Sequence, residues 1–253
     1  MITLREVTVS YQRHPAVHHL SGHFPQGEMT AITGPNGAGK SSLFKALLGA
    51  LPLSGGRVTW QGESRKKTAW LPQTATLDRS FPMRVAEVVM LGAWRHTGGF
   101  AGATRPLAQQ ARRTLDTVKL TGFEQRGIDT LSAGQFQRVL FARLMMQEAE
   151  VILLDEPFTA IDARTTQDLL SLLHLWKREG RTVIAILHDL DQIRSHFPQT
   201  LLLAREGIAW GKSAAVLSDT NLRRARAMAE RWDESAPRCE LPRASPLDPT
   251  RDP

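Results

Sequence analysis

The strongest chemical pattern in the sequence is a glycine-rich segment that follows the apolar run Met29–Thr33. Residues 34–41 read Gly-Pro-Asn-Gly-Ala-Gly-Lys-Ser, and the helical run Ser42–Leu48 comes directly after them. Glycines let backbone N–H groups curve around phosphate oxygens, and the N-terminus of a following helix adds partial positive charge. In such a loop Lys40 would reach the β- and γ-phosphates, and the Ser41 hydroxyl would bind Mg²⁺. The spacing therefore favours a nucleotide site over a glycine turn that only caps a helix.

An acidic pair at the end of a second apolar run could supply the rest of the chemistry. Val151–Leu154 is followed by Asp155, Glu156 and Pro157. The carboxyl ends of the strands are where an α/β sheet presents groups to its ligand. Asp155 is placed to hold the Mg²⁺ shell, and Glu156 to orient and polarise an attacking water. An ordinary strand-to-turn junction uses the same residue types, so the pair indicates a nucleotidase only beside the phosphate loop.

A third pattern, Leu131-Ser-Ala-Gly-Gln, lies 20 residues before Val151 and opens a long helical run. Ser132 and Gln135 have the spacing of a helix capping box. The exposed hydroxyl and amides of such a helix N-terminus can also bind a γ-phosphate. Since the Lys40 loop already covers one side of a nucleotide, this turn would need a phosphate held by another chain.

Apolar strand-like runs alternate with amphipathic helical patterns from Val7 to Leu187. This alternation is typical of an α/β fold with a mainly parallel sheet flanked by helices. The predicted strands are short apolar runs, and they span Thr3–Ser10, Met29–Thr33, Arg57–Trp60, Thr68–Leu71, Val151–Leu154, Thr182–Leu187 and Thr200–Ala204. We expect the last to form an antiparallel hairpin with Ile208–Trp210 across a turn at Glu206 and Gly207.

Between Leu77 and Met146 the strand signal disappears. Arg84–Trp94 and Leu107–Val118 have helical periodicity, and a glycine-rich loop around residues 98–102 separates them. These patterns predict an all-helical insert that hangs from the sheet.

The end of the chain has a different composition. Residues 236–253 contain five prolines and little apolar material. Such a segment cannot bury enough apolar surface to offset its ordering entropy, so we expect a disordered tail.

The bulk composition is that of a soluble globular protein and leaves its partners open. The 32 Lys+Arg against 25 Asp+Glu give a formal net charge of +7. That balance suits nucleic acid, an anionic membrane face or simple solubility, and the positive residues are scattered rather than in one run.

The sequence also bears on location. Cys239 is the only cysteine, so no internal disulfide can form. No run approaches the roughly 20 apolar residues that span a bilayer, and Met1–Glu6 is too polar to begin a signal peptide. We therefore expect a cytoplasmic protein that acts at a membrane only through a partner.

Together the motifs resemble those of ABC-transporter ATPases, in order and spacing, over nearly all of residues 2–231. Beyond the phosphate loop and the acidic pair, five features match family motifs. They are Tyr11 (the aromatic that stacks on adenine), Gln73 (the switch-loop glutamine), Leu131–Gln135 (the signature), Thr159–Asp162 (the dimer-contact loop) and His188 (the switch histidine). Ala133 departs from the family's usual glycine, so its φ must suit an L-residue.

The resemblance implies a P-loop NTPase-type, mainly parallel sheet core with an antiparallel β subdomain and an all-helical insert. It places the ATPase domain at residues 1–234, its helical subdomain at about 77–147, and the tail at 235–253. The residues implied to contact ATP are Tyr11, Gly34, Pro35, Asn36, Gly37, Ala38, Gly39, Lys40, Ser41, Ser42 and Gln73. Those implied to act in hydrolysis are Lys40, Glu156 and His188, and those implied to hold Mg²⁺ are Ser41, Gln73 and Asp155.

The resemblance also implies partners. Two identical chains would sandwich two ATP molecules, each between the Lys40 loop of one chain and Ser132, Ala133, Gly134 and Gln135 of the other, with Asp162 at the dimer contact. Permease subunits would dock on the helical insert at the inner face of the membrane, and a substrate-binding protein would act indirectly. The cofactors would be ATP and Mg²⁺, and no nucleic acid is expected.

Three segments are similar to the importers of zinc and manganese in particular. They are Phe81–Trp94 with Thr97–Phe100, Gln135–Arg143, and Glu156–Asp162. Iron-chelate and haem importers have similar ATPase subunits, so they remain an alternative. A non-transport ABC ATPase is a further alternative, but such proteins usually have two ATPase halves or a long coiled-coil insertion, and this chain has neither.

Four of the eight histidines fall at positions 14, 18, 19 and 23. Imidazole suits zinc, but this spacing matches no closed tetrahedral site and no thiolate lies nearby. We expect solvated loop histidines here, with a regulatory metal site as the alternative.

Overall fold

The structure is a computed structural model of the chain. It describes residues 1–11, 14–62, 64–73, 79–94 and 104–230. The predicted glycine-rich loop and proline-containing tail therefore lie outside the described residues. Within these ranges no helix combines the length and apolarity needed to cross a bilayer.

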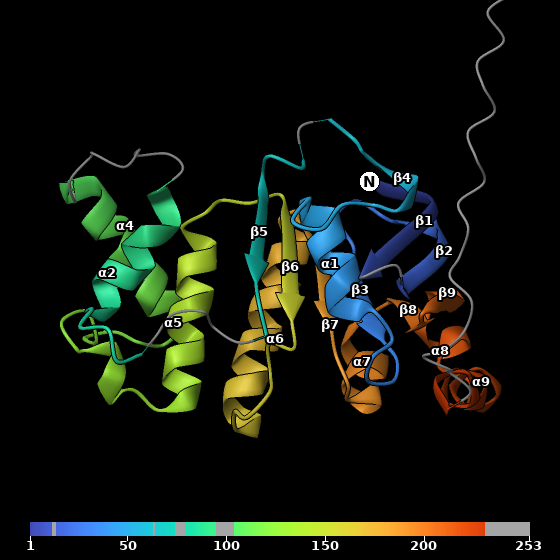
Figure 1. The fold of residues 1–253 in the computed structure, drawn as a ribbon. Helices are drawn as coiled ribbons and strands as arrows, with labels where there is room; N and C mark the ends of the chain where they lie inside the picture. Colours follow the sequence, from blue (N-terminus) through green and yellow to red (C-terminus); the bar gives the residue numbers. More distant parts are fainter. Residues whose placement is uncertain (12–13, 63, 74–78, 95–103, 231–253) are drawn as a thin grey trace, which may run out of the picture.

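A six-stranded sheet carries the site (Figure 1). Its strands, in spatial order, are β5 (Thr68–Leu71), β6 (Val151–Asp155), β7 (Thr182–Ile186), β3 (Met29–Thr33), β8 (Gln199–Ala204) and β9 (Glu206–Lys212). The first five run parallel, and β9 pairs antiparallel with β8. β3, β6 and β7 are buried along their whole length, as expected for strands covered on both faces. The α/β fold with a mainly parallel sheet is thus confirmed.

A second sheet is antiparallel and has the order β2 (His14–Phe24), β1 (Ile2–Tyr11), β4 (Gly55–Trp60). The prediction of loop histidines is wrong, because β2 contains that segment. Its pairing with β1 shifts register between Val7 and Val9, and His19 has φ +47°. Such a bulge breaks the period-2 alternation by which a strand is recognised in sequence.

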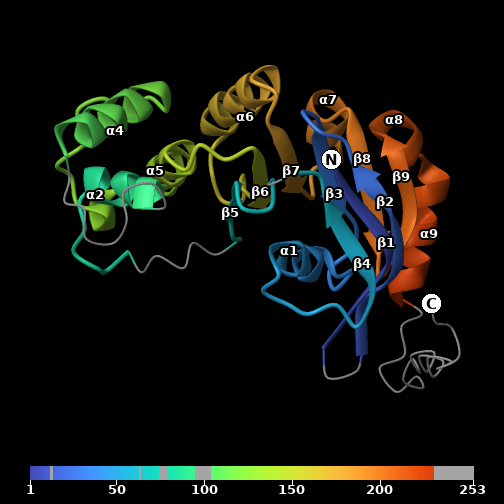
Figure 2. The ribbon, with the colours of Figure 1, turned by 90° about the horizontal axis from the view of Figure 1, so that it is seen from above.

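The two faces of the large sheet are covered by different elements (Figure 2). Leu153, Ile184 and Ile32 share one core with helix α1 (Lys40–Leu48) and the small sheet. Their strand neighbours point to the opposite face and share a second core with α6 (Ala163–Arg178). The alternation of side chains along β3, β6 and β7 produces both cores.

In the described part of the segment between β5 and β6, helices are joined by turns, and the strand-like pairing is an isolated bridge between Arg84 and Gly127. It contains α2 (Val85–Met90), η1 (Leu91–Ala93), α4 (Arg105–Thr117), η2 (Ile128–Thr130) and α5 (Ala133–Met145), which gather at one end of the molecule (Figure 1). The predicted helix Arg84–Trp94 is therefore an α-helix that continues as a short 3₁₀ turn.

The C-terminal part corrects the predicted hairpin. Ala204 pairs with Glu206, so the reversal lies at Arg205, which has φ +63°, and not at Glu206 and Gly207. A bulge between Leu202 and Leu203 accommodates this tight turn. Two short helices follow β9, α8 (Ser213–Val216) and α9 (Asp219–Glu230).

Among the described residues, Trp176 on α6 has the largest fully buried side chain, and its ring stacks on Phe141 of α5 with centroids 5.8 Å apart. Trp176→Ala should lower the free energy of unfolding by about 3–5 kcal/mol, because the cavity cannot fully collapse. Equilibrium urea denaturation measures this. Trp94→Ala is the matched control, since Trp94 is 56% exposed, and it should change the free energy by less than about 0.5 kcal/mol. Equal losses in the two variants would contradict this packing.

Candidate active site

The glycine-rich loop joins β3 to α1 and lies against β8 and β2. At Gly34 (φ +147°) an added Cβ would lie 1.8 Å from the carbonyl oxygen of Leu203. At Gly39 (φ +90°) it would lie 2.0 Å from the carbonyl oxygen of Ala16. No other residue can occupy these positions without moving backbone. Gly39 is also the N-cap of α1, so the loop ends on the free N–H groups of a helix.

Lys40, the first residue of α1, turns back over this loop. Its ammonium donates hydrogen bonds to the carbonyl oxygens of Gly34 and Pro35, both at 2.9 Å. Burial lowers the pKa of Lys40, and the nearby carboxylates of Glu156 and Asp155 act in the opposite direction. The positively charged Lys40 ammonium thus lies against the phosphate loop, where neutral carbonyl groups and not an ion pair hold it.

Asp155, the last residue of β6, is 4% exposed. Burial raises the pKa of its carboxyl group, and a hydrogen bond from Ser41 lowers it. The Asp155 Oδ1 atom is buried and has no hydrogen-bond partner among the described residues. A buried oxygen without a partner is costly, which makes it a fitting ligand for a cation.

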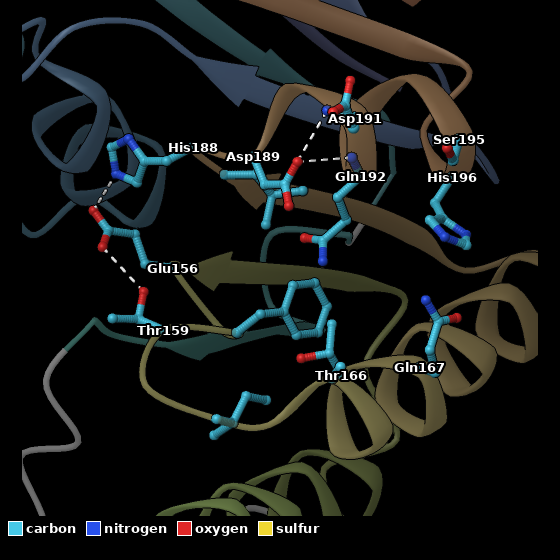
Figure 3. A pocket seen from close by; sticks show the side chains of 14 residues that line it. Glu156, Thr159, Thr166, Gln167, His188, Asp189, Asp191, Gln192, Ser195 and His196 are labelled. Atoms are coloured by element: carbon cyan, nitrogen blue, oxygen red, sulfur yellow. Dashed lines mark hydrogen bonds and ion pairs between the residues drawn. The ribbon is translucent and has the colours of Figure 1, made fainter.

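Glu156 is held by three side chains from three different loops. His188 Nε2 lies 2.6 Å from Oε1, and Thr159 Oγ1 lies 3.3 Å from Oε2 (Figure 3). Gln73 Nε2 donates to Oε2 at 2.9 Å. Glu156 itself has φ +50°, a strained conformation for this residue type. Strain that the surroundings maintain is common at active sites.

A cavity of about 590 Å³ opens beside this carboxylate. Glu156 and His188 lie at one end, and Gln167 and His196 lie at the other, between α6 and α7 (Leu190–His196) (Figure 3). A water molecule thus has room next to Glu156.

The Ser132–Gln135 turn forms the predicted capping box at the start of α5. Ser132 Oγ accepts from the Gln135 N–H at 3.2 Å, and Gln135 Oε1 accepts from the Ser132 N–H at 3.0 Å. Ala133 is the first helical residue and is not among the described residues with positive φ, so alanine fits in place of glycine. Within the described ranges, no hydrogen bond joins this turn to the phosphate loop.

The structure therefore brings the phosphate loop, Asp155, Glu156, Gln73 and His188 together and leaves the Ser132–Gln135 turn apart. Asp162 is the N-cap of α6, and a hydrogen bond from the Thr165 backbone lowers the pKa of its carboxyl group. Tyr11 ends β1, but its side chain lies outside the described residues.

Two of the four clustered histidines, His18 and His19, lie side by side on β2, with ring centroids 4.2 Å apart. His19 lies 2.9 Å from Glu6 and His18 lies 3.4 Å from Glu206, so the two rings contact different carboxylates. Across the described ranges there is no group of three or more His, Cys, Asp or Glu side chains that could hold a metal ion.

Two contacts of the site were not anticipated from the sequence. One is the bond from Thr159 to Glu156, and the other runs from Gln137 on α5 to the carbonyl oxygen of Pro157 at 2.7 Å. Both residues lie within recognised motifs, but no sequence signal distinguishes them from their neighbours.

A glycine-rich loop between the buried strand β3 and helix α1, with two acids at the end of β6 in the same sheet, defines a P-loop nucleotide-binding protein. Comparison with known proteins gives the family. A model described as ABC transporter matches residues 17–159. The zinc transport system ATP-binding protein TroB of Treponema pallidum is 35% identical over 228 residues, 88% of this chain and 86% of that protein. The manganese transport system ATP-binding protein MntB of Bacillus subtilis is 34% identical over 227 residues, with 88% and 91% covered.

Solved structures agree. A chain of an inward-facing ABC transporter, described as of the metal-chelate type, has TM-score 0.80 and 29% identity, with 89% and 88% of the two chains covered. The chain belongs to the ABC transporter family and is an ATP-binding subunit that hydrolyses ATP. The roles of individual residues toward ATP stay predictions.

Proposed function

We propose that this chain energises the import of zinc or manganese, as a dimer of identical subunits at the cytoplasmic face of a permease. One observation carries the proposal, namely 34–35% identity to zinc and manganese transport ATP-binding proteins over 88% of the chain. The same observation argues against the non-transport alternative.

ATP would bind with its phosphates on the loop of residues 34–42 and its adenine on Tyr11. When ATP binds, the Lys40 ammonium would leave the carbonyl oxygens of Gly34 and Pro35 and donate to phosphate oxygens instead. A hydrogen bond between an ammonium and a charged phosphate is stronger than one between an ammonium and a neutral carbonyl group. Since the Ser132–Gln135 turn lies apart from this loop, a second chain would have to supply the signature for each ATP.

The residues present fit Mg²⁺. Asp155 has a buried oxygen without a partner among the described residues, the Ser41 hydroxyl lowers the pKa of the same carboxyl group, and Gln73 donates a hydrogen bond to the neighbouring Glu156. These three residues would hold the ion, which would neutralise charge on the phosphates. Glu156 would orient the attacking water, and His188 would hold Glu156 and the γ-phosphate in register.

The helical segment supports permease docking. Phe81 and Trp94 are 60% and 56% exposed, and both lie in this segment. Besides Met1, they are the exposed large hydrophobic side chains of the described residues. Exposed aromatic side chains on one subdomain suit a protein interface.

A second candidate cargo is an iron chelate or haem. The similarity to the metal-chelate type transporter, at 29% identity, supports it.

Deleting the gene and measuring total cellular metals by mass spectrometry during growth in metal-depleted medium separates these cargoes. A selective fall in zinc or manganese is expected, restored by the wild-type gene and not by Glu156→Gln. If iron alone falls, the cargo is a chelate or haem. If every metal stays level, metal import is wrong.

A further inference from the structure

Helix α5, which begins at the signature turn Ser132–Gln135, is hydrogen-bonded to the loop that follows Glu156 in the same chain. Gln137 Nε2 donates to the Pro157 carbonyl oxygen at 2.7 Å, in a partly buried contact across 20 residues of sequence. Pro157 is buried and has no N–H, so this carbonyl is its only backbone hydrogen-bonding group. The bond therefore acts on the residue directly after Glu156.

Helix geometry explains why this residue makes the contact. Gln135 and Gln137 are separated by roughly 200° around the helix axis. Gln135 closes the capping box beside Ser132, so Gln137 points to the other side of α5, toward the end of β6. One short helical segment thus has the signature turn on one face and a contact to the Glu156 loop on the other.

A second point of contact lies at the signature turn itself. Gly134 is buried, and a Cβ there would lie 3.1 Å from Thr165 Oγ1 and 3.2 Å from Asp162 Oδ2 at the start of α6. Arg138, the neighbour of Gln137, donates to Asp168 of α6 at 2.7 Å. The segment from Glu156 to α6 is therefore attached to α5 at both of its ends.

The attached segment is strained. Glu156 and Ala160 have φ values of +50° and +59°. Such conformations persist only where neighbouring groups maintain them, and the hydrogen bond on the Pro157 carbonyl is one such restraint.

We propose that Gln137 is a positioning residue, which holds Glu156 of the same chain in its catalytic orientation and links that orientation to the position of the signature helix. This inference rests on the proposed function, in which the signature turn binds the ATP of the second chain. Each nucleotide would then influence hydrolysis at the other site through α5 and Gln137.

Gln137→Leu keeps the side-chain volume and removes the donor. We expect the steady-state kcat for ATP to fall about tenfold, while KM changes less than about twofold, because orientation and not binding is lost. ADP affinity, which in the proposed function depends on the phosphate loop and Tyr11 and not on α5, should stay unchanged and shows that the variant is folded. Gln110→Leu is the matched control, since Gln110 also donates a side-chain bond, at 3.0 Å to Glu148, but far from the site.

The double variant Gln137→Leu/Glu156→Gln identifies the route of the effect. It should still form an ATP-dependent dimer, because its signature turn is intact. Loss of that dimer with ADP binding retained would mean that Gln137 acts on the signature surface, and an unchanged kcat in Gln137→Leu would also overturn the proposal. If Glu156→Gln alone does not dimerise, the proposed dimer fails, while the kcat comparison still tests the positioning.

Discussion

Glu156→Gln is expected to lower the kcat for ATP hydrolysis by about 10²–10⁴-fold, the usual contribution of a general base. The amide cannot polarise water, but it retains the volume that His188, Gln73 and Thr159 enclose. ATP should therefore still bind and should hold two chains together, because the reaction that separates them is blocked. Steady-state hydrolysis and size-exclusion chromatography with ATP and Mg²⁺ measure the two effects.

Glu150→Gln is the control for this substitution. Glu150 lies just before β6 and pairs with Lys67 at the surface, so its replacement should leave hydrolysis within about twofold of wild type. A Glu156→Gln protein that still hydrolyses ATP at the wild-type rate would remove Glu156 from the reaction. A Glu156→Gln protein that stays monomeric in the presence of ATP would contradict the proposed dimer, in which two chains enclose each ATP.

Lys40→Ala should weaken ATP binding by at least about tenfold, since a charge-assisted hydrogen bond contributes about 1.5–3 kcal/mol. The loop keeps its backbone N–H groups, because Gly34 and Gly39 and not the lysine impose its shape. Titration with a fluorescent ATP analogue measures the dissociation constant.

Lys45→Ala provides the comparison, because Lys45 lies on the same helix and is exposed. Its dissociation constant should stay close to that of wild type. Equal weakening in the two variants would show that general positive charge, and not a contact from Lys40, determines affinity.

Much of the site was predictable, because each motif lies where one element ends and the next begins. The phosphate loop follows β3 and the acidic pair ends β6, and both strands are continuous apolar runs. Parallel strands bring their carboxyl ends to one edge of the sheet, so residues far apart in sequence meet there. The capping box at Ser132 is equally local, since it depends on residues three positions apart.

The features that were not predicted depend on tertiary contacts. β2 was missed because its bulge spaces Val17, Leu20 and Phe24 irregularly, although all three are buried. The hairpin reversal at Arg205 depends on a bulge in β8, and no residue type in that strand predicts the bulge. Likewise, Gln137 looks like any polar helix residue until the fold brings Pro157 to it.

In the proposed dimer, each ATP lies between the phosphate loop of one chain and the signature turn of its partner. A structure of Glu156→Gln with ATP and Mg²⁺ tests it most directly. We expect the γ-phosphate to contact Lys40 of one chain and Ser132 of the second copy. A γ-phosphate contacted by one chain alone, with both signature turns free, would contradict it.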